Sequence, residues 1–360
     1  MTELLTNPEP TFKVDGEAQG LLTRDAVSLL VAEDTQGLRT LELTLTAEAP
    51  SQPASGDSLL WLDGTSLDFG SELEVTLGAG DEARTVFTGV VSSLEATFEH
   101  DNAAHVRVLA EDALMRLRLR RRCQTWSKVS DADIAKKLAD EHELQVQADA
   151  PGPTYDVLQQ WNQSDLAFLR ERARRLSAEV WVKDGVLHFA SRAARTGETF
   201  TLTRGVELLA IAVRADLAHQ RSKVHVGGYD AARREKLDGK GETSAIQAEA
   251  PEGQTGPAIL ARVFDGAHES LRVRDVPLEG AEADAWATAQ MLRRARGFVT
   301  AEGTTRGTAA LDVGSRLTLQ GIGRPFSGEG YYVTAVRHVW GRAEGYRTHF
   351  QAERPTVNDS

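Results

Sequence analysis

Apolar and polar residues alternate in short runs along the first third of the chain. The runs lie at residues 12–14, 26–31, 41–45, 72–77, 85–92 and 105–109. A period of two residues is typical of strands that bury one face, and the Gly, Asp, Asn, Pro and Ser clusters between the runs indicate turns. Several short strands separated by turns favour a sandwich or barrel. We therefore expect an N-terminal arm at residues 1–10, followed by a domain that is nearly all β, either a sandwich or a barrel.

A helical period appears within residues 161–189. Apolar residues recur there every three or four positions, which predicts a helix with one buried face. Asn162, Ser164 and Asp165 precede the apolar positions, and all three residue types cap helices well. Alternating residues then flank the turn sequence Asp184-Gly185. We expect a capped amphipathic helix followed by a tight β-hairpin.

Other segments carry weaker patterns. Arginines alternate with leucines at 116–122, which favours a strand with solvated arginines; the alternative is a basic surface for an acidic partner. An apolar stripe after Ser130 or Asp131 predicts a second capped helix. Acidic residues at the start and arginines at the end predict another helix at 279–297. Residues 236–256 contain few bulky apolar side chains, so we expect an exposed loop there.

Composition and charge exclude several classes of protein. The chain has 360 residues, 41% of them hydrophobic, and a net charge of -12. An acidic balance argues against nucleic-acid recognition, and no apolar run approaches the roughly 20 residues of a membrane span. Cys123 is the single cysteine, so no intramolecular disulfide forms and a thiolate zinc site is not expected. The N-terminus lacks the features of a signal peptide, and we expect the protein to be made and folded in the cytoplasm.

The sequence contains none of the common catalytic motifs. The nine histidines are scattered, and neither HExxH, GxSxG nor a phosphate loop occurs. Asp165 is better explained as a helix cap than as an acid catalyst, and His338 as a packing residue within a strand. We expect Trp161 and the tryptophans at 181, 286 and 340 to serve cores or subunit contacts. No catalytic, cofactor or metal site is therefore predicted.

Two segments carry distinctive motifs. The first segment carries Q-x-N-x-S-D-L-x-F-L and V-K-D-G-V-L-H-F, and the second, at 312–354, carries Y-Y-V-T-x-V-x-H and G-Y-x-T-x-F-x-x-x-R. Together they resemble the late control D and VgrG family, which comprises the baseplate hub proteins of contractile phage tails, type VI secretion systems and related extracellular injection particles. The residues that match are Trp161, Asn162, Ser164, Asp165, Phe168, Leu169, Gly185, Phe189, Gly314, Gly321, Tyr331, Tyr332, His338, Tyr346, Phe350 and Arg354.

The resemblance implies a mainly β fold with α/β insertions, in the α+β class. It implies two β-barrels like those of a tail tube, and a homotrimer in which six barrels match a sixfold tube. The first barrel would be residues 11–115, and the second, discontinuous barrel would be 195–228 plus 297–355. The other parts would be insertions at 116–194 and 229–296 and a tail at 356–360. Assembly would take place in the bacterial cytoplasm.

The implied role is structural, without a cofactor. The hub would join the spike to the inner tube protein, nucleate the tube and contact other baseplate components. Family members with a fused spike continue beyond this point, whereas this sequence ends at Ser360, so we expect a hub-only type with a separate spike protein. The alternatives are a tail-associated cell-wall hydrolase and a soluble carbohydrate-binding β protein.

Overall fold

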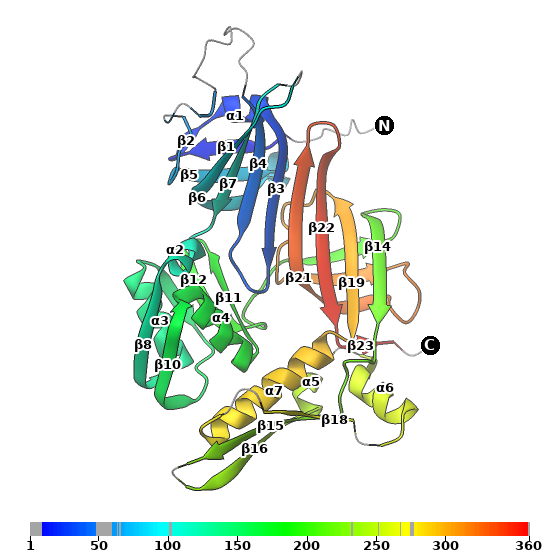
Figure 1. Ribbon diagram of the computed structural model, residues 1–360. Coiled ribbons are helices and arrows are strands. Elements are labelled where there is room, and N and C mark those ends of the chain that lie inside the picture. The colour runs from blue at the N-terminus through cyan, green and yellow to red at the C-terminus, as the bar shows by residue number, and fades with distance from the viewer. Residues whose placement is uncertain are drawn as a thin grey trace.

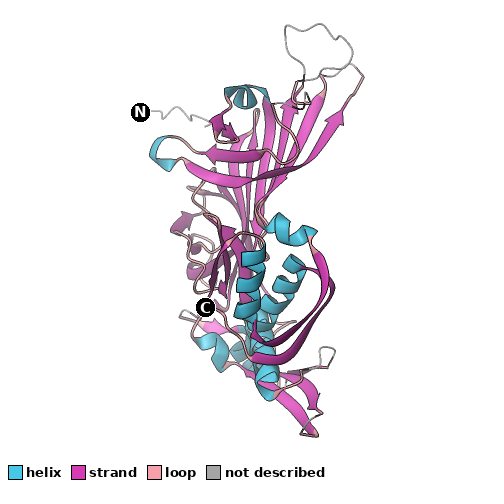
Figure 2. Cartoon of the chain, turned by 90° about the vertical axis from the view of Figure 1, so that its left-hand side faces the viewer, coloured by secondary structure: helices cyan, strands magenta, loops and turns pink. Residues whose placement is uncertain are grey.

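The computed structural model describes residues 9–47, 60–62, 64, 66–100, 103–231, 233–250, 252–266, 268–273 and 277–358. Most of the predicted N-terminal arm, and the end of the predicted tail, lie outside these residues. The described chain is mainly β, which confirms the prediction from the alternating pattern. Figure 2 shows that most of the helical residues gather below the large sheet, in the two insertions.

The first half of the large sheet comes from the N-terminal third of the chain. Its elements are β1 (Thr11–Val14), β2 (Glu17–Ala18), α1 (Gly20–Asp25), β3 (Ala26–Asp34), β4 (Thr40–Thr46), β5 (Glu72–Leu77), the 3-10 turn Gly80–Glu82, β6 (Arg84–Thr97) and β7 (His105–Glu111). Alternate side chains enter one core, including Leu41 and Leu43 of β4 and Val106 and Val108 of β7. A sheet with one buried face requires this alternation.

The second half comes mainly from the C-terminal part. Its strands are β13 (Thr199–Thr203), β14 (Leu208–Ala215), β19 (Val299–Arg306), β20 (Arg316–Gln320), β21 (Gly328–Gly341) and β22 (Gly345–Arg354). Leu317, Tyr331, Val333 and Phe350 are buried in its separate core. The two halves thus have different cores although they share one sheet.

The two predicted barrels are instead joined in one open sheet of thirteen strands (Figure 1). Its main path runs β14-β19-β22-β21-β3-β4-β7-β6-β5-β1-β2. β14 does not pair with β21, whose edge from Ala335 to Gly341 is occupied by β3. β6 does not pair with β3, whose two partners are β4 and β21. Among the described strands, therefore, neither half closes on itself.

The two halves repeat the same five-stranded unit. In chain order, β3, β4, β5, β6 and β7 pair as β14, β19, β20, β21 and β22 do. The irregularities coincide as well: β6 shifts register between Val91 and Ser93 against β7, and β21 shifts between Val333 and Ala335 against β22. Bulges re-aim a strand at a defined residue. Their shared positions indicate an internal duplication. We call each of the two five-stranded sets, β3 to β7 and β14 with β19 to β22, a repeated unit.

The first insertion contains the predicted helix and hairpin. Its elements are α2 (Leu114–Leu119), β8 (Arg121–Ser130), α3 (Asp131–Glu141), β9 (Gln145–Ala148), β10 (Thr154–Ser164), α4 (Asp165–Leu176), β11 (Ala178–Lys183) and β12 (Val186–Ser191). The hydroxyl of Ser164 accepts the N–H of Ala167 and caps α4, and Ser130 caps α3 in a capping box. Asp184 and Gly185 take positive φ angles of 51° and 76° in the hairpin turn. The helix, its cap and the hairpin are therefore confirmed.

The strand predicted within residues 116–122 is wrong in its first part. Residues 114–119 form α2, in which Leu114 and Leu117 are completely buried. The two buried leucines are therefore three residues apart, as on one face of a helix, and not two apart as in a strand. The side chain of Asp112 accepts the N–H of Leu114 at 2.9 Å and starts the helix. Arg121 and Arg122 do begin the strand β8.

The second insertion is a small sheet packed on a long helix. Its elements are β15 (Lys223–Asp230), β16 (Glu235–Glu242), α5 (Ser244–Gln247), β17 (Gln254–Thr255), α6 (Gly256–Val263), β18 (Glu269–Arg272) and α7 (Gly280–Arg296). The helix predicted at 279–297 is confirmed as α7. Residues 223–228, expected in the second barrel, belong to β15 instead, which pairs with β16 and β18. The end of the chain, β23 (Thr356–Val357), pairs with β17.

The loop expected at 236–256 is largely regular structure. Its glycines do not loosen the chain but let β16 approach α7. A Cβ on Gly239 would come within 2.2 Å of the Ala283 carbonyl carbon, and one on Gly241 within 2.2 Å of the Ala287 oxygen. The few bulky residues here therefore reflect close packing of a strand on a helix, which composition alone does not distinguish from an exposed loop.

Candidate functional site

Buried charges lie where both halves of the sheet meet the first insertion. Glu33 is the last residue but one of β3, Glu179 lies on β11, and Arg195 follows β12; each is 7% exposed or less. Arg195 donates from Nη2 to Glu33 Oε1 at 2.5 Å and from Nη1 to Glu179 Oε2 at 3.2 Å. Buried charges of this kind are stable only when paired. Together with Arg39 and Asp312, these residues form what we call the junction cluster.

Arg39 extends this cluster to the second half of the sheet. It precedes β4, and its guanidinium donates to Glu33 and, at 2.7 Å, to Asp312 Oδ1 before β20. Its backbone N–H donates to Asp112 Oδ2 at 2.8 Å. Burial alone would lower the pKa of Arg39, but the Glu33 and Asp312 carboxylates raise it overall. Arg39 therefore stays charged and links segments 273 residues apart in the sequence.

Tyr332 of β21 is the second contact between the insertion and the sheet. Its hydroxyl donates to Glu179 Oε2 at 2.9 Å. The guanidinium carbons of Arg192 and Arg316 lie 4.1 Å and 4.4 Å from the centre of its ring. Burial and the nearby Glu179 carboxylate raise the pKa of Tyr332. The phenol thus remains a neutral donor and holds Glu179 in place.

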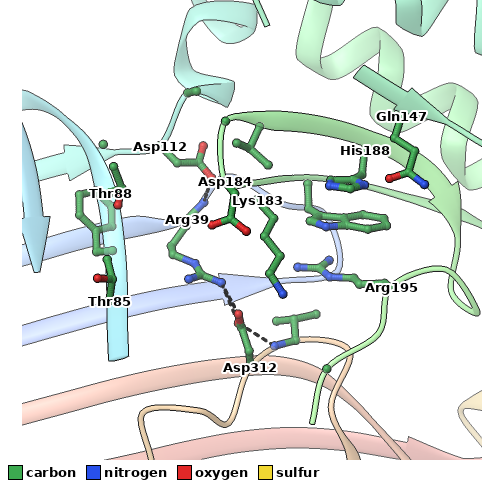
Figure 3. Close-up of a pocket in the computed structure, with 18 of the residues that line it drawn as sticks. Arg39, Thr85, Thr88, Asp112, Gln147, Lys183, Asp184, His188, Arg195 and Asp312 are labelled. Atoms are coloured by element: carbon green, nitrogen blue, oxygen red, sulfur yellow. Dashed lines mark hydrogen bonds and ion pairs between the residues drawn. The ribbon is translucent and has the colours of Figure 1, made fainter. Parts of the chain in front are cut away.

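A cavity of about 710 Å³ opens onto the junction cluster. Figure 3 shows the Arg39 side chain running from beside Asp112 toward Asp312, with Lys183 and Arg195 on the other side of the cavity. The rings of Trp181 and His188 stack at 4.7 Å between centroids on the insertion side. Residues from both halves of the sheet and from the insertion therefore share this cavity.

Two groups in the cavity have shifted proton affinities. Burial raises the pKa of Asp112 to about 6, and the Glu33 carboxylate adds to that rise. Burial also lowers the pKa of His188, with help from the charges of Arg195 and Lys183. The lining contains both positive and negative side chains, so it does not select a ligand by net charge. Its clearest physical effect is to hold three parts of the chain in a fixed geometry.

No cluster of three or more His, Cys, Asp or Glu side chains suited to a metal ion occurs in the described part of the chain. Within the same residues, none of the helices combines the length and the apolar character needed to cross a membrane.

The first group of signature residues surrounds the start of α4. Ser164 is the cap, and Asp165 is the first helical residue rather than the cap itself. Its buried carboxylate accepts from Arg122 Nη2 at 2.5 Å and Gln160 Nε2 at 2.9 Å, and it contacts His142 Nε2 at 2.9 Å. Although burial opposes it, the hydrogen bond from Arg122 is the main cause of a lowered Asp165 pKa. Asp165 thus anchors α4 to β8 and α3.

The other members of this group have different environments. Phe168, Leu169 and Phe189 are buried in the core of the insertion. Gly185 forms the hairpin turn. Asn162 has a φ of +43° in the bulge of β10, and Trp161 beside it is 69% exposed. Trp161 therefore serves no core in this chain, which leaves the subunit-contact role as the prediction for it.

The second group lies along the second half of the sheet. His338 Nδ1 is 2.8 Å from the Tyr346 hydroxyl inside the core, and the Tyr331 hydroxyl donates to the Phe326 carbonyl at 2.7 Å. Arg354 donates to Asn358 Oδ1 at 2.6 Å, and Gly314 donates its N–H to the Val333 carbonyl at 3.0 Å. Phe350 lies in the core, and Gly321 has a positive φ. Of the second group, Tyr332 contacts the first insertion through Glu179.

Sequence reasoning missed the junction cluster. Arg39 and Arg195 lie in connecting segments without a recognisable motif. Glu33 carries a usable signal, because it continues the buried period of Leu29 and Val31 along β3. A carboxylate at the next buried position predicts a buried ion pair, although not its partner.

A family model and solved structures match this chain. The model of the family described as the Alg8 N-terminal domain matches residues 58–340. The 43 kDa tail protein of prophage MuSo2 from Shewanella oneidensis has a TM-score of 0.68 at 14% identity, covering 97% of this chain and 98% of that one. A tail protein from Neisseria meningitidis MC58 has a TM-score of 0.66 at 14% identity, covering 98% and 100%.

A type VI secretion system component from E. coli has a TM-score of 0.57 at 13% identity, over 97% of this chain and 77% of that one. That protein is described as structurally similar to the phage T4 tail proteins gp27 and gp5. No curated protein sequence matches the chain. These structures establish a tail-protein fold, and the residues matched by the family model extend over well over half of the sequence. The chain therefore belongs to the Alg8 N-terminal domain family.

Proposed function

We propose that this protein is the baseplate hub of a contractile phage tail or injection particle, of the late control D type. Three copies form a ring that joins a threefold spike to a sixfold inner tube and starts assembly of the tube. The protein acts by holding other chains in position and not by catalysis. Its partners are two further copies of itself, a spike protein, the inner tube protein and other baseplate components.

The observation that carries this proposal is the repeated unit. One chain holds two such units side by side in a continuous sheet. A ring of three chains would offer six similar units on a threefold frame, which is what a symmetry adaptor needs. The tail-protein fold supports the same role. We place the two tube-like domains of the proposal in residues 11–115 and in 195–228 plus 297–355, without the strand β15.

The junction cluster has a mechanical part in this proposal. Its buried ion pairs fix the angle between the two repeated units and the position of the first insertion. Six units can match a sixfold tube only if the angle inside a chain equals the angle between chains. A rigid internal joint sets that angle before assembly.

Co-expression with a tail-tube protein and a spike protein tests this function. Purified hub should cap one end of short tubes in negative-stain images, and omission of the hub should leave the tube protein unpolymerised or without a capped end. A hydrolase would instead release soluble fragments from purified cell wall, and a carbohydrate-binding protein would bind polysaccharide without capping tubes. Either result in the absence of tube capping would overturn the proposal.

A further inference from the structure

Part of one edge of β6 and one edge of β14 have no partner strand among the described residues. β6 pairs with β5 through Val90, its Val91 bonds to the segment before β5, and β7 covers the other edge as far as Thr97. One edge of residues 92–97 is therefore open. β14 pairs with β19 on one edge only. Open edges carry unpaired backbone N–H and C=O groups, which favour addition of another strand.

The pairing of β21 with β3, which we call the internal joint, provides a template for these edges. β21 is the counterpart of β6 in the repeated unit, and β3 is the counterpart of β14. In the joint, β21 and β3 pair antiparallel, with Ala335 opposite Asp34 and Gly341 opposite Ser28. The equivalent pairing of β6 with β14 does not occur within the described chain.

The shared bulges fix the register of the missing pairing. Ser93 follows the bulge of β6 as Ala335 follows that of β21. Ala210 follows the bulge of β14 as Ser28 follows that of β3. Transferring the internal joint therefore places Ser93 opposite Asp216, and the pairing runs on past Phe98 opposite Ile211.

We propose that β14 of one copy adds antiparallel to the open edge of β6 in the next copy, in this register. This inference rests on the proposed ring and names the surface that closes it. The contact is heterologous, because two different edges meet, and such contacts generate rings when the rotation closes. The partner is a second copy of this chain.

The side chains on one face of the proposed joint are all apolar. This face would combine Leu94 and Ala96 of β6, and Phe98 directly after it, with Ile211, Val213 and Ala215 of β14. Phe98 is 66% exposed in the single chain, whereas Trp340, at the equivalent place in the internal joint, is 2% exposed. Ring closure would bury Phe98 as the internal joint buries Trp340, which explains a large exposed aromatic side chain at a sheet edge.

The opposite face carries complementary charges. The register places Glu95 directly opposite Arg214, whose side chains are 52% and 75% exposed in the single chain. In the single chain Glu95 makes a long contact of 3.5 Å with Arg107, and Arg214 is paired with its near neighbour Asp216. Opposite charges at directly opposed positions stabilise a strand pair, and like charges destabilise it.

Charge reversal tests the joint. We expect Glu95→Arg or Arg214→Glu to reduce the ring formed with spike and tube proteins by roughly tenfold, because the unfavourable pair recurs at every joint. The double variant should recover most of the loss. Glu74→Arg is the matched control, since Glu74 is a strand glutamate in an ion pair with Lys13 within the first half of the sheet. Single variants that assemble like the wild type, or a double variant without recovery, would overturn the register.

Cross-linking tests the register without altering charge. Thr97→Cys and Ala212→Cys in a Cys123→Ser chain should form disulfide-linked trimers under oxidation, whereas Thr97→Cys with Ala210→Cys, two residues out of register, should not. If the wild type forms rings but the in-register pair does not cross-link, the joint is wrong and the proposed hub function stands. If the wild type forms no ring even with its partners, the proposed function itself falls.

Discussion

Phe350 of β22 lies directly opposite Gly303 of β19, so close that a Cβ on Gly303 would come within 2.3 Å of the ring. The equivalent pair in the first repeated unit is Val108 opposite Leu43. In the second unit, therefore, the large ring of Phe350 lies opposite a glycine, which has no side chain. In the first unit, two side chains of medium size lie opposite each other. The volume of the cross-strand pair is balanced although the residues differ, which is how a core keeps its packing density.

Gly303→Ala should lower the free energy of unfolding by about 1–3 kcal/mol, because the new methyl group overlaps the Phe350 ring. Combining it with Phe350→Val should recover part of that loss, as coupled neighbours do. Chemical denaturation measures both effects. Gly280→Ala is the control, since nothing lies within 4 Å of a Cβ there. An equal effect of Gly303→Ala with and without Phe350→Val would contradict the packing account.

Arg39→Met should lower the free energy of unfolding by roughly 3–5 kcal/mol, because Glu33 would lose a buried cationic partner and Asp312 its ion pair. The exposed pair Lys13–Glu74 offers a contrast: Lys13→Met should cost less than about 1 kcal/mol. Thermal and urea unfolding can compare the two variants. Similar small losses for both would show that the junction cluster does not join the units.

His338 should make the second half of the sheet sensitive to acid. Burial lowers its pKa from 6.5 to about 4, so the folded state favours the neutral imidazole. The unfolded chain binds the proton more readily, and stability is therefore present above pH 6.5 and is lost as pH falls toward 4. The expected loss from this group is roughly 2–3 kcal/mol.

Urea unfolding between pH 7 and pH 4 measures this dependence. A His338→Gln chain should show a shallower decline than the wild type. Asp112 acts in the opposite sense, because its raised pKa of about 6 favours the protonated carboxyl in the folded state and adds stability as pH falls. An Asp112→Asn chain separates the two contributions. Identical slopes for wild type and His338→Gln would reject the assignment to His338.

Substitutions at the start of α4 should show how much the cap and the buried ion pair each contribute to the free energy of unfolding. Ser164→Ala should cost about 1 kcal/mol through loss of the cap. Asp165→Asn should cost more, roughly 2 kcal/mol, because the charge-assisted hydrogen bond from Arg122 is weakened inside the protein. Asp133→Asn in the exposed capping box of α3 is a control with a smaller expected effect. A larger loss for Ser164→Ala than for Asp165→Asn would show that the cap, and not the buried ion pair, anchors the helix.

The helix α4 and the hairpin that follows it were predictable because the residues that determine them are neighbours in the sequence. Ser164, the apolar positions of α4 and the Asp184-Gly185 turn are close in sequence, and their pattern states the helix and hairpin directly. The α2 helix was missed because alternating Leu and Arg fit a period of two as well as three. The glycines of β16 were missed because their partner α7 is more than 40 residues away.

Long-range relations were not predictable from the same patterns. The pairing of β21 with β3 depends on which edge is open when both halves have formed, and no local pattern records that. Arg39 meets Asp312 only after this joint exists. The repeated unit has too little residue similarity to be noticed in the sequence, since what its two copies share is the order of strands and bulges.

The most direct test of the hub account is the mass and symmetry of the assembled protein. Light scattering with averaged electron micrographs should be measured on the chain alone and with its spike and tube partners. We predict a ring of three chains with six similar units around its axis in the presence of the spike. A single chain under every condition, or a ring with another number of chains, would contradict the account.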